Sequence, residues 1–150
     1  MKYMRHWLST ILILALVGCS FTAKVINAYS GPERSDREVA ILFTPEIQAP
    51  SNDRSGGWLA AVDGQPVGSY MDGYPQATKV LPGSYLFKIG CPELILNKST
   101  SFHLVRAKLE AGHYYELICE RFSVAAVDRG TSYKSVEPLL SKSLKEQLRR

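Results

Sequence analysis

Three cysteines offer the widest range of chemistry in this 150-residue chain. Cys19 ends a short apolar N-terminal stretch, whereas Cys91 and Cys119 lie far from it in the rest of the sequence. A cysteine thiol can take a lipid, form a disulfide or bind a metal ion. None of the three belongs to a C-x-x-C pair or to a Cys/His spacing typical of zinc sites, so we expect no bound metal.

The histidines and carboxylates form no catalytic pattern. His113 and Glu116 fall on one expected strand, three residues apart, and therefore point to opposite faces. We expect Glu116 and Glu120 to lie on a solvated face of that strand, and His103 on the inward side of another. Because no G-x-S-x-G motif or nucleophile beside a base accompanies them, the sequence predicts a protein that is not an enzyme and needs no cofactor.

The segment that ends at Cys19 has the layout of a secretory signal peptide. A basic start at residues 1–6 precedes a mostly apolar run at 7–17 and the small residue Gly18. The run is shorter than the roughly 20 apolar residues that a transmembrane helix needs. Leu16-Val17-Gly18-Cys19 resembles the lipobox of bacterial lipoproteins, in which the chain is cleaved before the cysteine and the thiol carries lipid.

This resemblance implies a signal peptide at 1–18, a lipidated tether at 19–37 and a membrane anchor at the N-terminus. Ser20, where inner-membrane lipoproteins usually have Asp, favours the outer membrane, with the protein facing the periplasm. The three acyl chains of such proteins anchor permanently, since each buried CH₂ contributes about 0.8 kcal/mol. A secretory cut at Ala23 or Ala28 is the alternative.

Residues 38–150 are long enough for one domain with its own core, but not for two. Loss of Lys2 and Arg5 with the signal peptide lowers the formal net charge from +4 to +2. No basic stretch is interleaved with aromatic residues, and nucleic-acid binding is therefore not expected.

Cys91 and Cys119 become an even pair of thiols once Cys19 carries lipid. The compartment outside the inner membrane is oxidising, which favours a disulfide. Cys91 shares a strand face with Phe87, and Cys119 shares one with Tyr115, so both thiols point into the core. We expect a Cys91–Cys119 disulfide. Two reduced, buried cysteines acting as small apolar residues are the alternative.

Short apolar or alternating runs between turn residues predict a small antiparallel β-sandwich or open barrel. Residues 46–57 are expected to form a loop. Leu140, Leu144 and Leu148 recur every four residues and predict an amphipathic helix over about 137–149. Its leucines would dock on the sheet, and contact of its basic face with the membrane is the alternative. The expected strands are 38–43, 58–62, 67–70, 77–81, 84–91, 101–110, 113–120 and 122–128.

Three turn motifs carry a second resemblance. They are Val62-Asp63-Gly64-Gln65, the stretch Val80-Leu81-Pro82-Gly83-Ser84-Tyr85, and Ala111-Gly112-His113-Tyr114-Tyr115. The layout resembles PEGA-like β-sandwich modules and small uncharacterised bacterial envelope lipoproteins. The resemblance implies an interaction domain of the envelope without a catalytic residue.

The loop around residues 69–75 is the best candidate for recognition. Tyr70, Met71 and Tyr74 lie in it, and Trp58 precedes it. Tyrosine supplies amphipathic contact area at low entropic cost, and glycine lets a loop adapt. The alternative is that these aromatic residues cap one end of the sandwich.

The sequence thus predicts a non-catalytic binding or structural module whose partner is an envelope protein or a cell-wall component. A periplasmic inhibitor or small-ligand-binding protein using the Tyr70–Tyr74 loop is the alternative.

Overall fold

The computed structural model describes residues 23–46, 54–69, 71–92, 100–121 and 123–149. The expected signal peptide, Cys19 and Tyr70 lie outside these residues, so the predictions on them stay predictions. Within the described ranges, no helix has the length and apolar character needed to cross a membrane.

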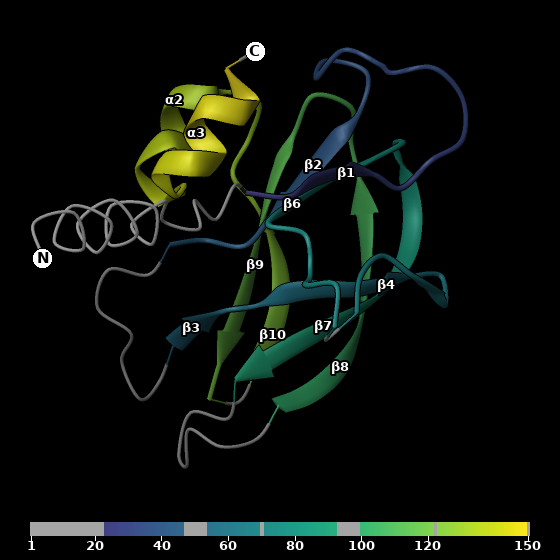
Figure 1. Cartoon of the computed structure of the whole chain (residues 1–150), viewed down its shortest axis with the longest axis vertical. Helices are drawn as coiled ribbons and strands as arrows, with labels where there is room; N and C mark the ends of the chain where they lie inside the picture. The colour runs from purple at the N-terminus through teal and green to yellow at the C-terminus, as the bar shows by residue number, and fades with distance from the viewer. Residues whose placement is uncertain (1–22, 47–53, 70, 93–99, 122, 150) are drawn as a thin grey trace, which may run out of the picture.

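The strands form two stacked sheets (Figure 1). Sheet A has the order β1-β6-β2-β9-β10, with β3 also paired to β9, and sheet B has the order β5-β4-β7-β8. Most pairs are antiparallel, but β1–β6 and β2–β9 are parallel. The strands of sheet A are β1 (Val25–Asn27), β2 (Ala40–Phe43), β3 (Arg54–Gly56), β6 (Ala77–Val80), β9 (Tyr114–Glu120) and β10 (Ser123–Asp128). Those of sheet B are β4 (Trp58–Val62), β5 (Gln65–Pro66), β7 (Gly83–Pro92) and β8 (Thr100–Leu109).

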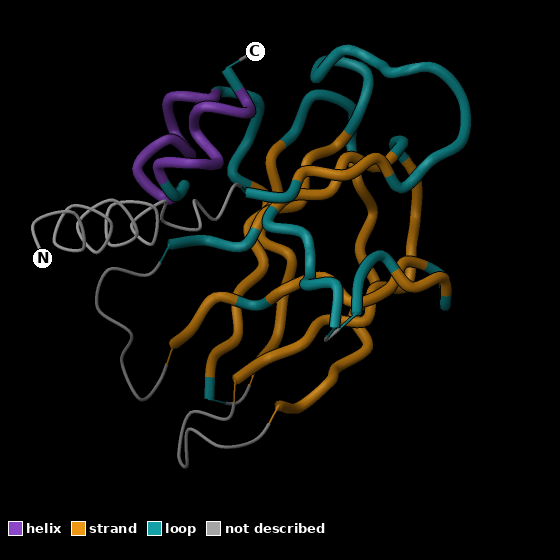
Figure 2. The backbone as a smooth tube through the Cα atoms, viewed as in Figure 1, coloured by secondary structure: helices purple, strands orange, loops and turns teal. Residues whose placement is uncertain are grey.

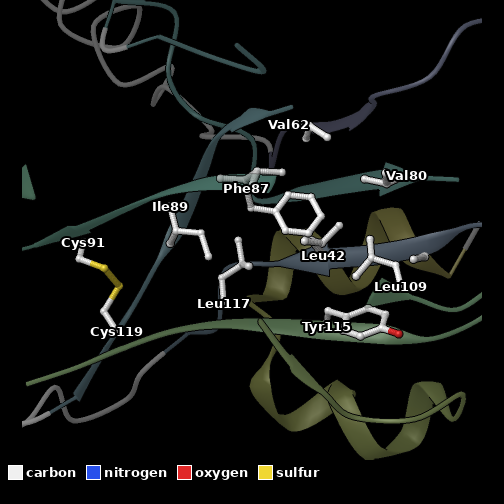
Figure 3. Close-up of a cluster of buried hydrophobic side chains, with 12 residues drawn as sticks. Leu42, Val62, Val80, Phe87, Ile89, Cys91, Leu109, Tyr115, Leu117 and Cys119 are labelled. Carbon is white, nitrogen blue, oxygen red and sulfur yellow. A yellow bond between two sulfur atoms is a disulfide. The ribbon is translucent and has the colours of Figure 1, made fainter. Parts of the chain in front are cut away.

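The space between the sheets is filled by the inward residues of the alternating strands. Phe87 and Ile89 of β7 face Leu42 of β2 and Leu117 of β9 across this core, as Figure 3 shows. The predicted disulfide is present at one end of the core, where it joins Cys91 of β7 to Cys119 of β9 with Cα atoms 5.9 Å apart. The bridge thus links the two sheets covalently. The predicted mainly β fold, a sandwich with a C-terminal helix, is confirmed.

A helical layer covers the other face of sheet A (Figure 2). It consists of α2 (Tyr133–Val136), the 3-10 turn η1 (Glu137–Leu139) and α3 (Lys142–Leu148). Leu140 and Leu144 are fully buried against β2, which confirms that the leucine stripe docks on the sheet. The single helix predicted over 137–149 is wrong, because the chain extends at Leu140 and Ser141 then caps α3 by accepting from the Leu144 amide at 3.2 Å.

Sheet A is therefore buried on both faces, which corrects the expectation for β9. Tyr115 and Leu117 face sheet B, while Tyr114 packs against the helical layer. Glu116, expected on a solvated face, is only 1% exposed. All four residues of β2 are buried as well, and a continuous apolar strand is typical of a sheet covered on both sides.

Two segments expected to lack regular structure belong to the sheet. Residues 54–56, inside the predicted loop 46–57, form β3 and pair with β9. Residues 25–27, inside the predicted tether 19–37, form β1 and pair with β6. Ala23 is buried among the residues of the helical layer, so the domain begins earlier than residue 38. Each of these strands has only three residues, which is too few to show an alternating pattern.

Candidate binding surface

The side of sheet B that faces away from the core is the most distinctive exposed surface of the described residues. In an antiparallel pair, directly opposed residues point to the same side. Phe87 and Val105 point into the core, so the neighbouring pairs Lys88–Leu104 and Leu86–Arg106 point outward. We name this surface the outer face. It comprises Trp58, Ala61, Leu86, Lys88, Gly90, Phe102, Leu104, Arg106 and Lys108.

Large apolar side chains lie exposed on this outer face. Leu104 is 69% exposed and Phe102 is 46% exposed, although both lie on a strand of a well-packed sheet. A groove of about 420 Å³ is lined by these two residues together with Leu86, Lys88 and Tyr74. Exposed apolar side chains that gather around a groove are typical of interaction sites. The groove also joins the sheet to the loop that the sequence singled out.

Trp58 and Tyr74, two of the predicted recognition residues, lie together. Their ring centroids are 5.8 Å apart, and Trp58 lies opposite Gly90 in the pairing of β4 with β7. A Cβ atom at Gly90 would approach the indole Nε1 to 2.4 Å, so the absence of a side chain there lets the Trp58 ring lie flat on the sheet. Glycine at this position thus extends the aromatic part of the outer face.

The loop that carries Tyr74 is held by hydrogen bonds near its tip. The Ser69 hydroxyl donates to the Asp72 carboxylate at 2.6 Å and accepts from the Asp72 amide at 3.1 Å. Met71, between them, is 89% exposed. Gly73 has a φ of 76°, which glycine adopts without strain. The described part of the predicted loop therefore presents Met71 to solvent and brings Tyr74 to the groove, while Tyr70 lies outside the described residues.

Cations flank the apolar part of the outer face. The Lys88 ammonium lies 4.7 Å from the centre of the Phe102 ring, which is within the range of a cation–π interaction. Arg106 and Lys108 form no ion pair with any other described residue. Arg106, Lys108 and Asp63 line a second hollow at this face, and the Asp63 carboxylate accepts a hydrogen bond from the Leu86 amide at 2.7 Å. The face thus combines apolar area with three cations, Lys88, Arg106 and Lys108, that pair with no carboxylate of the described residues.

Tyr85, on the inward side of β7, lines the hollow of Asp63, Arg106 and Lys108. Burial raises the pKa of its phenol, and the negative charge of Asp63 raises it further. The phenol therefore stays neutral at physiological pH and adds no negative charge beside Arg106 and Lys108.

The two histidines of the described chain, His103 and His113, both have polar side chains beside their rings. His113 Nδ1 lies 2.9 Å from an Asp128 oxygen, and the other ring nitrogen faces Glu110 at 3.7 Å rather than a serine or a thiol. His103 is exposed and contacts the Ser101 hydroxyl at 2.9 Å. No group of three or more possible metal ligands occurs in the described ranges. His113 thus lies between two carboxylates, and His103 lies beside a serine hydroxyl.

Glu116 lies in a buried ion cluster that the sequence did not predict. Its carboxylate accepts from Arg129 Nε at 2.7 Å and also contacts Arg129 Nη2, while Arg54 Nη2 lies 3.2 Å from the second oxygen. Arg54 belongs to β3, and Arg129 directly follows β10. The cluster therefore ties β3 and the end of β10, two of the three strands that pair with β9, to that central strand.

Comparison with known proteins gives no match to a protein-family model, to a curated protein or to a solved structure. What the protein does is therefore argued from its own residues. The sequence singled out Trp58, Met71 and Tyr74 as candidates, but not Phe102, Leu104 or the cations beside them on the outer face. Phe102 and Leu104 alternate with inward residues and share a face with Arg106, so two large apolar side chains on an otherwise polar strand face were the available signal.

Proposed function

We propose that the protein is a lipid-anchored, non-catalytic binding module of the bacterial envelope, attached to the outer membrane and facing the periplasm. Its partner is an envelope protein that docks on the outer face of sheet B. The observation that carries this proposal is the gathering of the exposed Phe102 and Leu104 with the half-buried Tyr74 around one groove. An acylated Cys19 would hold this domain at the membrane, and its resemblance to a PEGA-like module agrees with an interaction role.

An extended, acidic protein segment fits the outer face best. β8 is ten residues long and lies at the edge of sheet B, where, among the described strands, it pairs only with β7. Such an edge offers backbone donors and acceptors to an added strand. Phe102 and Leu104 would contact apolar side chains of that strand. Arg106 and Lys108 would pair with its acidic side chains, which complements their charge.

Labelling with palmitate tests the anchor. Cells that produce the full chain are expected to incorporate labelled palmitate into the wild-type protein, whereas Cys19→Ser removes the acceptor thiol and abolishes the label. Cys91 and Cys119 serve as internal controls, because a disulfide leaves them no free thiol. Equal labelling of wild type and Cys19→Ser would contradict lipidation at Cys19.

Photo-crosslinking in intact cells tests the binding surface. A benzoylphenylalanine at position 104 is expected to give a protein adduct, and the same residue at Ser123, exposed at the start of β10, is expected to give none. Reversing the flanking charges with Arg106→Glu and Lys108→Glu should reduce the adduct by about tenfold, the effect of losing roughly 1.4 kcal/mol of binding free energy.

The competing functions give other results in the same experiment. A cell-wall component would give an adduct that muramidase digests, which would overturn a protein partner. An inhibitor or small-ligand-binding protein that uses only the predicted loop would give an adduct when benzoylphenylalanine replaces Met71 and none when it replaces Leu104. The first result would contradict the proposed class of partner, and the second would contradict the proposed position of the binding site.

A further inference from the structure

We propose that α3 and the cations beside it form the membrane-facing surface of the domain, in contact with anionic lipid headgroups. The outer face of sheet B is then directed away from the bilayer, where a partner can reach it. This inference rests on the proposed anchor at Cys19, but it concerns a different surface. We name it the helix surface, and it comprises Lys24, Lys142, Lys145 and Arg149.

The start of the described chain is fixed to α3. The Ala23 amide donates to the Ser143 hydroxyl at 2.7 Å, and Gln147 Nε2 donates to the Ala23 carbonyl at 2.6 Å. Ala23 is only 3% exposed and belongs to the apolar cluster between sheet A and the helical layer. Figure 1 shows this purple end of the described chain beside α3. From residue 23 onward, the chain is therefore part of the domain and not a spacer.

The distance between anchor and domain follows from chain length. Residues 20–22 separate Cys19 from Ala23, and an extended chain advances at most about 3.3–3.6 Å per residue. The Cα atoms of Cys19 and Ala23 therefore lie no more than about 14 Å apart. Sheet A stands between the apolar cluster of Ala23 and sheet B, and stacked sheets are about 10 Å apart. The helix surface therefore lies closer to a lipid on Cys19 than the outer face of sheet B does.

The charge of the helix surface suits an anionic bilayer. Lys24, Lys142 and Arg149 are exposed, Lys145 is half-buried, and none of the three lysines pairs with an acidic side chain of the described chain. Arg149 pairs with Glu137, and Glu146 is the exposed acid of α3. Leu144 and Leu148 are buried against the sheet, so α3 offers its polar side to the headgroups and does not insert.

Lysine footprinting on vesicles tests this orientation. The mature chain, residues 19–150 with its disulfide intact, has Cys19 as its one free thiol, which can be coupled to a maleimide lipid. On vesicles of phosphatidylethanolamine and phosphatidylglycerol, acetylation of Lys24, Lys142 and Lys145 should slow by about threefold or more relative to the free protein. Lys88 and Lys108 of the outer face are the matched controls and should react as before.

The chemical tether separates this test from the test of lipidation. It holds Cys19 at the membrane whether or not cells acylate it, so a negative palmitate result and a negative footprint are distinguishable. Protection should weaken on phosphatidylcholine vesicles and in high salt, because the contact is electrostatic. Protection of Lys88 and Lys108 instead, or equal reactivity of both lysine sets on anionic vesicles, would overturn the proposed orientation.

Discussion

Reduction of the Cys91–Cys119 disulfide is expected to lower the melting temperature of the domain by about 10 °C or more. The bridge joins residues 28 positions apart and connects the two sheets. On the chain-entropy account, closing a loop of this length stabilises the fold by roughly 3–4 kcal/mol, because the unfolded chain loses freedom. For a domain of this size, each kcal/mol corresponds to roughly 3–5 °C in melting temperature. Thermal unfolding followed by circular dichroism, with and without a phosphine reductant, measures the effect.

The double variant Cys91→Ala and Cys119→Ala is the control. Its melting temperature should be low and should not respond to reductant, since it has no bridge to lose. Gly57 shows how closely the surroundings fit the bridge, because a Cβ atom there would approach the Cys119 sulfur to 2.9 Å. Two reactive thiols at positions 91 and 119 in unreduced mature protein would contradict the disulfide. So would a melting temperature that is insensitive to reductant.

The sandwich could be predicted because its strands carry local signals. β7 alternates Phe87 and Ile89 with outward residues, and Asp63-Gly64 marks a tight turn in which both residues have positive φ, as the structure shows. The same alternation placed Cys91 and Cys119 on inward faces, and the disulfide follows from that placement. A strand whose alternating residues show which of its faces is buried could therefore be predicted without knowing which strands it pairs with.

The helical layer explains most of what the sequence did not reveal. A strand with apolar residues on one face is expected to expose the other, and Glu116 was assigned to solvent on that rule. The rule fails in sheet A because α2 and α3 cover its second face. Only the continuous apolar run of β2 indicated a sheet buried on both sides. The short β1 and β3 depend on pairing with distant strands and leave no comparable pattern.

The sequence identified some of the residues that the structure places on the candidate binding surface. Met71 and Tyr74 were singled out by their residue types in a glycine-rich loop, and Trp58 as an aromatic residue that precedes it. Their meeting with Phe102 and Leu104 depends on the register of β4, β7 and β8, which residue types do not specify. Gly90 is an example. Its lack of a side chain leaves room for the Trp58 ring, and only the structure shows that this ring lies across it.

Arg129→Met is expected to destabilise the domain by about 3 kcal/mol, although Arg129 is one-third exposed. The substitution leaves the carboxylate of Glu116, which is 1% exposed, with Arg54 as its one remaining cation among the described residues. A buried charge that loses its partner costs far more than an exposed one, because water cannot replace the lost hydrogen bonds. Urea unfolding of the mature protein measures the change.

Arg149→Met is the matched control, because its partner Glu137 lies on the surface. Both side chains of that pair are substantially exposed, and losing it should cost no more than about 1 kcal/mol. Equal losses in Arg129→Met and Arg149→Met would contradict the buried cluster.

A second variant separates the effect of charge from the effect of packing. Adding Glu116→Leu to Arg129→Met removes the unpaired carboxylate and should recover part of the lost stability, since an apolar replacement needs no cation. If the double variant is instead less stable than Arg129→Met alone, Glu116 stabilises the sheet by contacts other than its charge.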